Sequence, residues 1–288
     1  MMRHRNQYPV EMMCRVLKVS KSGYYAFLKR PQSRRSAENE QLTAQIREVH
    51  EKSRSTYGSP RITAVLWALG MLVSRSRVAR LMQRAQIRSK LKRRFVATTD
   101  SAHGHRIAPN ILDRQFQPGR LRRAWVSDIT YIHTQQGWLY LTVIIDLGDR
   151  RVIGWALSST LHASVTVVAA WRMALANRGL AQGLVFHSDR GTQYACKEFR
   201  ELLERGGMVT QSMSRKGDCW DNAVAESFFK SLKEEWLKGQ VFKTRQQAEN
   251  EVFKYIEVWY NRQRLHSSLG YKSPEQYAKA NTKATIAA

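Results

Sequence analysis

The sequence has few cysteines and few prolines. Its 288 residues include 3 Cys and 6 Pro. Cys14, Cys196 and Cys219 stand far apart, with no C-x-x-C pair and no nearby histidine at zinc-ligand spacing. We therefore expect neither a disulfide framework nor a structural zinc site, and a reducing cytoplasm suits the chain.

Long hydrophobic runs are also absent. The first residues, MMRHRNQYPV, lack the apolar segment of a signal peptide, and no stretch of about 18 apolar residues occurs. We therefore expect a protein with no membrane partner, located in the cytoplasm and associated with the nucleoid.

Acidic charge is scarce relative to basic charge. Against 48 Lys and Arg stand 23 Asp and Glu, which gives a formal net charge of +25. Residues 1–123 hold 27 of the 48 basic residues but 7 of the 23 acidic ones. Such an excess indicates a polyanionic partner, with DNA ahead of an acidic membrane surface. A histone-like or ribosome-associated binder is the alternative, but the large carboxylate-bearing second half disfavours it.

Residues 1–87 are predicted to be helical. Apolar stripes predict two short helices over 9–30, a longer one over about 37–52, and a further pair that begins near Pro60. Ser74 can cap the last helix of this pair. The arrangement is typical of a helix-turn-helix.

Basic side chains that follow this pattern are candidates for DNA contact. Arg75 and Arg77 on the last helix either make specific contacts with DNA or are merely solvated or phosphate-facing. Residues 88–123 read as an extended basic linker with a cluster that includes Arg93 and Arg94. The linker either lies along a phosphate backbone or acts as a plain flexible tether.

From residue 124 the pattern changes to strands and then alternates with helices. The runs WVSDITYIHT, GWLYLTVIID and RVIGWALS predict three antiparallel strands. A helix at about 162–178, a strand at 184–187, a helix at about 195–205, a strand at 208–211 and helices at about 221–238 and 244–260 follow. This order predicts an α+β fold with an RNase H-like core over 124–240, a five-stranded mixed sheet, and a helical extension over 241–288.

Three carboxylates are candidates for chemistry. Asp128 lies mid-strand, where an aspartate is costly unless it is paired or binds metal. Asp189 follows the apolar run LVFHS at the carboxyl end of a strand, and Glu226 lies on a helix that can face the sheet. Each taken alone has an ordinary structural alternative. Together they supply hard oxygen ligands for two Mg²⁺ ions, for which Mn²⁺ can substitute, and such a metal pair promotes phosphodiester cleavage and transfer.

Several motifs around these carboxylates are selective. The runs WVSDITYI, HSDRGTQY, MSRKGDCWDNAVAESFFKSLKEE and YNRQRLHSSLGYKSPEQY resemble the catalytic core of bacterial insertion-sequence transposases of the "IS three" family, OrfB product. MCRVLKVSKSGYYAFLKR and YGSPRITAVLWALG resemble the amino-terminal region of that product. The resemblance covers residues from about 10 to 278.

This resemblance implies a retroviral integrase-type core with Asp128, Asp189 and Glu226 as a DDE triad. The 36 residues between Asp189 and Glu226 are one more than the family usually has. Lys233 matches a basic residue that follows the glutamate in the family, and Lys230 shares its helical face. DNA phosphate contact and ordinary pairing on a solvated helix both remain open for these lysines.

The carboxyl-terminal motif adds two more arginines. Arg262 and Arg264 can hold DNA or can belong to a packed helix and loop that closes the core. Trp220, just before the Glu226 helix, is expected to pack in the core.

The expected activity is Mg²⁺-dependent DNA strand cleavage and strand transfer at the ends of an insertion sequence. Its partners would be terminal inverted repeats and target DNA, a second copy or larger homo-oligomer on paired ends, and an upstream OrfA product or an OrfA-OrfB fusion. Two rival hypotheses are a non-catalytic DNA-binding regulator and an RNase H-like nuclease that cuts without joining. The intact triad argues against the first, and the basic amino-terminal half argues against the second.

Overall fold

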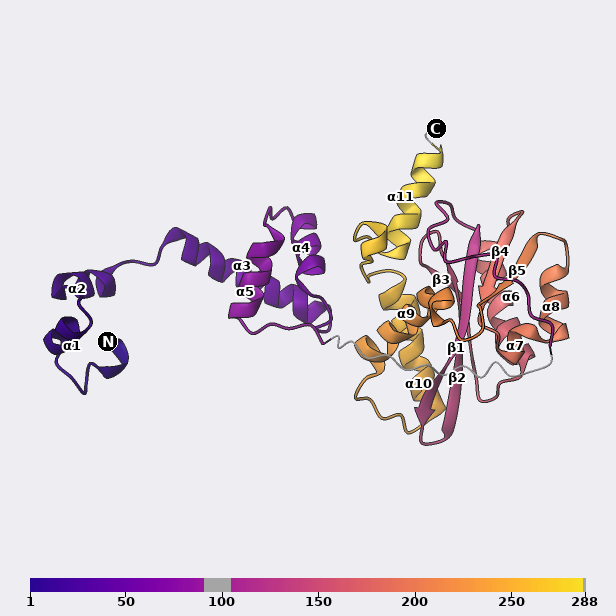
Figure 1. The fold of residues 1–288 in the computed structure, drawn as a ribbon, viewed down its shortest axis with the longest axis horizontal. Helices are drawn as coiled ribbons and strands as arrows, with labels where there is room; N and C mark the ends of the chain where they lie inside the picture. Colours follow the sequence, from indigo (N-terminus) through magenta and orange to yellow (C-terminus); the bar gives the residue numbers. More distant parts are fainter. Residues whose placement is uncertain (91–104, 287–288) are drawn as a thin grey trace. The chain divides into compact units, whose positions relative to one another are not determined.

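The computed structural model describes residues 1–90 and 105–286. Its contacts divide the chain into two compact units (Figure 1). Unit 1 comprises Met1–Ser53 and Gly58–Arg88, and unit 2 comprises Arg54–Tyr57 and Ser89–Ala288. Within the described residues, no helix combines the length and apolar character needed to cross a bilayer.

Unit 1 is entirely helical, as its sequence predicts. Its helices are η1 (Met2–His4), α1 (Val10–Val16), α2 (Lys21–Lys29), α3 (Arg34–Lys52), α4 (Ser59–Ala68) and α5 (Arg75–Arg84). The hydroxyl groups of Ser20, Ser33 and Ser74 accept hydrogen bonds from backbone N–H groups in the first turns of α2, α3 and α5. Since Ser33 supplies this cap, α3 begins a few residues before the predicted position.

The α3, α4 and α5 helices share a small apolar core. Ile46 from α3, Ile62 and Leu66 from α4 and Val78 from α5 are completely buried. These residues lie on the apolar stripes of the sequence, and their burial fixes the helix-turn-helix pair α4 and α5 against α3.

Unit 2 is built on a five-stranded mixed sheet. Its strands are β1 (Ala124–Thr134), β2 (Gly137–Asp146), β3 (Val152–Ser158), β4 (Leu184–Ser188) and β5 (Val209–Met213). Their order across the sheet is β3-β2-β1-β4-β5. The first three strands form an antiparallel meander, whereas β4 runs parallel to both β1 and β5. The predicted mixed sheet is confirmed.

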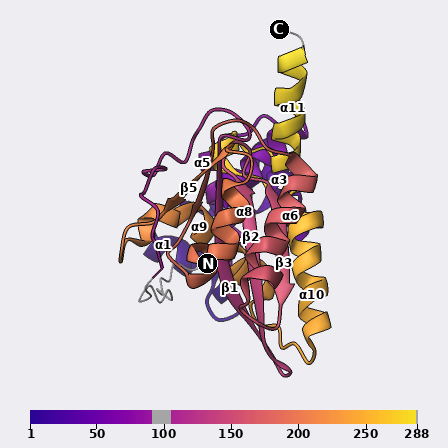
Figure 2. The same cartoon turned by 90° about the vertical axis from the view of Figure 1, so that its right-hand side faces the viewer.

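Helices cover both faces of this sheet (Figures 1 and 2). The helices after the meander are η2 (Ala163–Val165), α6 (Val167–Arg178), α7 (Thr192–Ala195), α8 (Lys197–Glu204), η3 (Cys219–Asn222), α9 (Ala223–Ser231), η4 (Leu232–Leu237), α10 (Arg245–Phe253), η5 (Lys254–Tyr260), η6 (Ser267–Leu269) and α11 (Pro274–Ile286). On one face, α6, α7 and α8 enclose an aromatic core that includes Trp125, Trp171, Phe186 and Phe199. On the other face, α9 and α10 pack against β1.

The two helices predicted at 221–238 and 244–260 each change winding partway along. α9 continues into the π-helix η4, and α10 continues into the π-helix η5. Single π-turns inside helices occur frequently at functional sites. Here η4 carries Lys233, one of the predicted DNA contacts, directly after the helix of Glu226.

Part of the predicted linker packs on the sheet of unit 2. Residues 105–123 belong to this unit, and Leu112 is buried in it. The Ser212 hydroxyl on β5 accepts hydrogen bonds from the backbone N–H groups of Ile111 and Leu112, at 2.9 and 3.1 Å. This part of the linker is therefore a fixed portion of unit 2, unlike the flexible tether that we weighed as one alternative.

Candidate active site

Strand pairing brings two predicted site residues to neighbouring positions. In the parallel ladder of β1 and β4, Trp125 lies opposite Phe186, and Val126 lies opposite His187. Asp128 comes two residues after Val126, and Asp189 comes two residues after His187. If the register of this ladder is continued, Asp128 lies opposite Asp189. Asp189 comes directly after the end of β4, as predicted.

The alternation of side chains decides which face these aspartates occupy. Trp125 and Phe186 point into the aromatic core beneath α6. Because successive side chains of a strand point to opposite faces, Asp128 and Asp189 point away from that core. This is the face on which α9 packs against β1, and α9 carries Glu226 in its first turn. The three predicted carboxylates therefore belong to one face of the sheet.

Local hydrogen bonds orient the two aspartates. One carboxylate oxygen of Asp128 accepts the backbone N–H of Ile129 at 2.8 Å, and one of Asp189 accepts the backbone N–H of Gly191 at 3.0 Å. A Cβ atom on Gly191 would lie 3.0 Å from that same Asp189 oxygen. The turn after β4 thus favours a residue without a side chain at this position.

The three carboxylates crowd negative charge into the site. Burial raises the pKa of Asp128 well above its usual value, and the charges of Asp189 and Glu226 raise it further. Burial also raises the pKa of Glu226. All three residues remain partly exposed, so solvent and ligands can reach them. Crowded carboxylates that are still accessible are a suitable environment for a cation.

In the described structure, the three carboxylates do not converge on a single metal position. Within residues 1–90 and 105–286, no three His, Cys, Asp or Glu side chains lie close enough to hold one ion together. The charge of Glu226 contributes to the raised pKa of Asp128, but the acidic groups line a site without forming a finished coordination shell.

Lys233 is a basic neighbour of Asp128. Burial lowers the pKa of Lys233, and the charge of Asp128 opposes that shift. Lys230, which was expected on the same helical face, is exposed on α9 and is therefore accessible to solvent.

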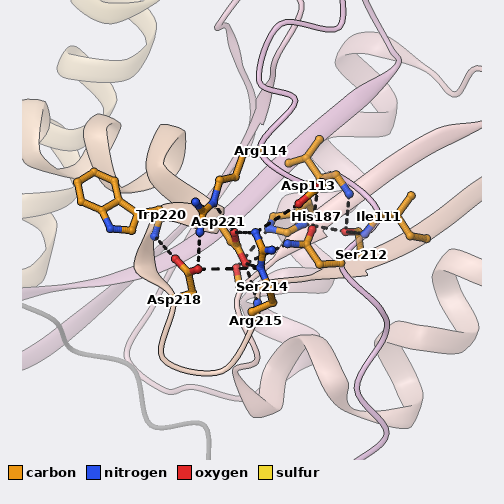
Figure 3. A network of polar contacts seen from close by, with 12 residues as sticks. Ile111, Asp113, Arg114, His187, Ser212, Ser214, Arg215, Asp218, Trp220 and Asp221 are labelled. Atoms are coloured by element: carbon orange, nitrogen blue, oxygen red, sulfur yellow. Dashed lines mark hydrogen bonds and ion pairs between the residues drawn. The ribbon is translucent and has the colours of Figure 1, made fainter.

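A polar network holds the loop between β5 and α9 (Figure 3). At its centre is Asp221, which is fully buried. Arg215 donates to the Asp221 carboxylate from its backbone N–H at 2.9 Å and from its guanidinium at 2.9 and 2.7 Å. Arg114 Nε and Asn110 Nδ2, both from the predicted linker, donate to it at 2.9 Å each. Hydrogen bonding from Arg215 is the main cause that lowers the pKa of Asp221.

Two neighbours of the predicted site residues connect this loop to β4 and β1. His187 on β4 is buried, and its ring nitrogens lie 2.8 Å from Ser212 Oγ and 3.2 Å from Ser214 Oγ. Asn222 donates through Nδ2 to the carbonyl oxygen of Ser127 at 3.0 Å, next to Asp128. Both residues therefore have structural hydrogen bonds. Asp221 was not among the residues predicted from the sequence, because two of its partners, Asn110 and Arg114, lie more than 100 positions away in the chain.

Trp220 does not pack in the core. It precedes Asp221 in η3 and is 65% exposed. The expected burial is thus wrong. The polar network holds the buried Asp221 and leaves the adjacent indole in solvent.

The carboxyl-terminal arginines differ from each other. Arg262 is exposed. Arg264 is buried, and its guanidinium donates to the Glu235 carboxylate at 2.7 and 2.6 Å and to Ser231 Oγ at 3.0 Å. This burial contradicts the expected DNA contact by Arg264, because a guanidinium enclosed with its own counter-ion is not offered to a phosphate. The packed alternative is the correct one.

In unit 1, the predicted DNA-contacting arginines also differ. Arg75 is exposed at the start of α5. Arg77 Nε donates to Asn39 Oδ1 at 3.0 Å, and Arg77 Nη2 lies 3.5 Å from a Glu38 carboxylate oxygen, so α3 restrains this side chain. Arg93 and Arg94 lie outside the described residues.

A basic cavity of about 270 Å³ lies between α3 and α5. Four arginines line it together with short polar side chains: Arg35, Arg77, Arg80 and Arg84, with Ser33, Ser36 and Asn39. Arg77, Arg80 and Arg84 are spaced three and four residues apart, which places them on one face of α5. That spacing is the signal by which the sequence could have identified this cavity.

Comparison with known proteins follows the same division of the chain. A family model described as an HTH-like domain matches residues 37–95, and two described as an integrase core domain match residues 120–219 and 208–274. A simian T-cell lymphotropic virus intasome structure aligns over 80% of this chain and 73% of its own, with a TM-score of 0.45 and 13% identity.

Two relatives match nearly the whole sequence. The "Insertion element IS600 uncharacterized 31 kDa protein" of Shigella sonnei is 42% identical over 92% of this chain and 97% of its own length. The "Transposase InsF for insertion sequence IS3A" of Escherichia coli (strain K12) is 38% identical over 97% of each chain. With an integrase core, an HTH-like domain and relatives of this identity over nearly its full length, the chain belongs to the IS3 family of DNA transposases.

Proposed function

We propose that Asp128, Asp189 and Glu226 bind divalent metal and form the catalytic triad of this transposase. The observation that carries the proposal is the register of β1 and β4, which sets Asp128 opposite Asp189 on the face covered by the helix of Glu226. Six carboxylate oxygens from these residues form a hard donor set of the kind that Mg²⁺ prefers.

The electrostatics of the triad fit a cation. Burial and like charge together raise the pKa of Asp128, which means that its ionised form is disfavoured without a counter-charge. Lys233 supplies one positive charge against three negative ones. A Mg²⁺ pair, or Mn²⁺ in its place, would supply the remaining positive charge and the Lewis acidity that phosphodiester cleavage and transfer need.

The side chains of the site have separate tasks in cleavage and joining. Asp128 and Asp189 hold the metal from the sheet, and Glu226 completes the donor set from α9. Lys233 contacts a phosphate near the scissile bond, with Lys230 further out on the surface. In the first reaction, water attacks the phosphodiester at the element end and the 3′ oxygen of the element leaves as a hydroxyl. This hydroxyl then attacks a phosphodiester of target DNA, and the 3′ oxygen of the target strand leaves.

DNA is held at sites away from the triad as well. We assign phosphate contacts to the arginine-lined cavity of unit 1, to Arg75 and to Arg262, because these guanidinium groups border a cavity or are exposed. Arg93 and Arg94, which lie outside the described residues, are further proposed DNA contacts. Binding would cover the terminal inverted repeats and target DNA in the cytoplasm, at the nucleoid. Pairing of two element ends requires a dimer or larger assembly, with an OrfA product or an OrfA-OrfB fusion as a further partner.

The test is strand transfer on oligonucleotides that carry the element's own ends, with Mg²⁺. We expect Asp189→Asn to abolish joining, whereas Glu234→Gln, which alters a partly exposed carboxylate on η4, retains it. A second measurement follows the thermal unfolding of each variant as Mg²⁺ is added. Wild type and Glu234→Gln should be stabilised by the metal and Asp189→Asn much less, because ligand binding stabilises only a chain that holds the ligand. Equal joining by Asp189→Asn and wild type would refute the assignment.

A further inference from the structure

Trp220 is the most exposed tryptophan of the chain. It is 65% exposed, compared with 55% for Trp67 and 51% for Trp138, while the others are buried or partly buried. An indole left in water forfeits the favourable free energy that its burial would provide. A ligand that covers the ring would recover this free energy.

The backbone that carries Trp220 is held in place rather than loose. The Asp218 carboxylate accepts the backbone N–H of Trp220 at 3.1 Å and pairs with Arg114. On the other side of the tryptophan, the Asp221 carboxylate is fixed by Arg215 and Arg114. Figure 3 shows these polar groups gathered on one side while the indole of Trp220 projects away from them. The ring is thus presented on a fixed support.

This support lies next to the proposed catalytic carboxylates. Asp221 contacts His187, which comes two residues before Asp189. Asn222 donates to the carbonyl oxygen of Ser127, which precedes Asp128. Glu226 lies one helical turn beyond Asn222. Residues that directly follow Trp220 therefore touch both strands that carry the aspartates.

The loop that carries Trp220 also carries basic side chains. Lys216 is exposed in the same loop, and the side chain of Arg215 is 50% exposed although it pairs with Asp221. A flat apolar ring beside basic groups is the combination with which proteins bind single-stranded nucleic acid, because bases stack on the ring while phosphates meet the cations.

We propose that Trp220 is a stacking platform for an unpaired base of the DNA strand at the active site. The inference rests on the proposed function, since it names the DNA feature that the same site would bind. Stacking of this kind tolerates any base, so the platform would fix the position of the strand without reading its sequence.

The test measures equilibrium binding of the full chain, without divalent metal, to three short duplexes of one sequence. One is blunt, one has an unpaired 3′ extension, and one has the same extension with abasic nucleotides. We expect wild type to prefer the extended duplex, and Trp220→Ala to lose roughly tenfold of its affinity for that duplex. Trp220→Phe should keep most of the preference. The abasic extension should bind equally to wild type and Trp220→Ala.

The matched control is Trp138→Ala, which removes another exposed indole from the start of β2, and it should bind all three duplexes as wild type does. Equal weakening of all three duplexes by Trp220→Ala, or no weakening, would overturn the proposal. A change of oligomeric state in Trp220→Ala by sedimentation would instead assign the ring to a protein contact. Because no metal and no cleavage are involved, loss of the triad assignment would leave this binding result intact and distinguishable.

Discussion

The buried pair of Glu235 and Arg264 permits a quantitative prediction about stability. Glu235 lies on η4 and Arg264 lies beyond η5, and their side chains are 0% and 6% exposed. Burial alone would lower the pKa of Arg264, but hydrogen bonding to Glu235 raises it above its usual value. The pair therefore joins the π-helix that follows the Glu226 helix to the carboxyl-terminal part of unit 2.

The perturbation is Glu235→Gln, which keeps the shape of the side chain and removes its charge. Arg264 is then left buried without a counter-ion, and breaking a buried pair in this way costs about 3–5 kcal/mol. Glu234→Gln provides the control on the next residue. Its pair with Lys238 is exposed and spaced i,i+4, so we expect a loss of about 0.3–0.5 kcal/mol.

The assay is urea unfolding of the full chain followed by tryptophan fluorescence, to which all 8 tryptophans contribute, including Trp236 beside Glu235. The double variant Glu235→Leu with Arg264→Met should recover most of the lost stability, because it removes both charges from the interior. The reasoning is refuted if Glu235→Gln costs no more than Glu234→Gln. It is also refuted if a fully folded Arg264→Lys protein loses affinity for DNA, since the buried guanidinium would then be a DNA ligand after all.

Two further predictions concern other buried groups of unit 2. Burial lowers the pKa of His187 to about 4, against an opposing effect of Asp221, whereas the unfolded chain keeps a value near 6.5. The unfolded state therefore binds the proton first, so stability should rise by up to about 3 kcal/mol from pH 4 to 6.5 and then level off, and urea unfolding of His187→Gln should lack this slope. The second concerns the Tyr57 hydroxyl, which accepts the backbone N–H of Leu265 at 2.9 Å beneath a ring that is 4% exposed. Tyr57→Phe should cost about 1–2 kcal/mol and Tyr57→Ala about 3–5 kcal/mol in the same assay, and wild-type unfolding of both variants would contradict the predicted role.

The sequence predicted the parts of unit 2 that depend on local periodicity. The alternation of Val, Ile and Tyr around Asp128 is a property of one strand, and so is the apolar run before Asp189. Both positions are confirmed. The helix of Glu226 was also expected, because its apolar stripe is visible within one segment. The fold and the positions of the acidic residues could thus be predicted from short-range signals combined with family motifs.

Features that depend on distant partners could not be predicted in this way. Arg264 is buried because Glu235 lies 29 positions earlier, and no local pattern indicates that pairing. Asp221 is held by Arg114 across 107 positions. Trp220 was expected in the core because large aromatic residues are usually buried, but the network that fixes Asp221 leaves the adjacent indole outside. In each case a tertiary contact overrode an average preference of the residue type.

These long-range contacts show that unit 2 includes residues that precede its first predicted strand. The family model for the integrase core begins at residue 120, and the alternating pattern of strands begins at about 124. Asn110 and Arg114 lie before both positions, yet they donate to the carboxylate of Asp221 that holds the loop before the Glu226 helix. A fragment that starts at residue 120 would leave Asp221 with Arg215 as its cation. It would also lack Ile111 and Leu112, whose backbone N–H groups donate to the Ser212 hydroxyl. The segment that reads as a linker is therefore part of what orients the third carboxylate, and activity of the isolated sheet domain would require those bonds to be replaced.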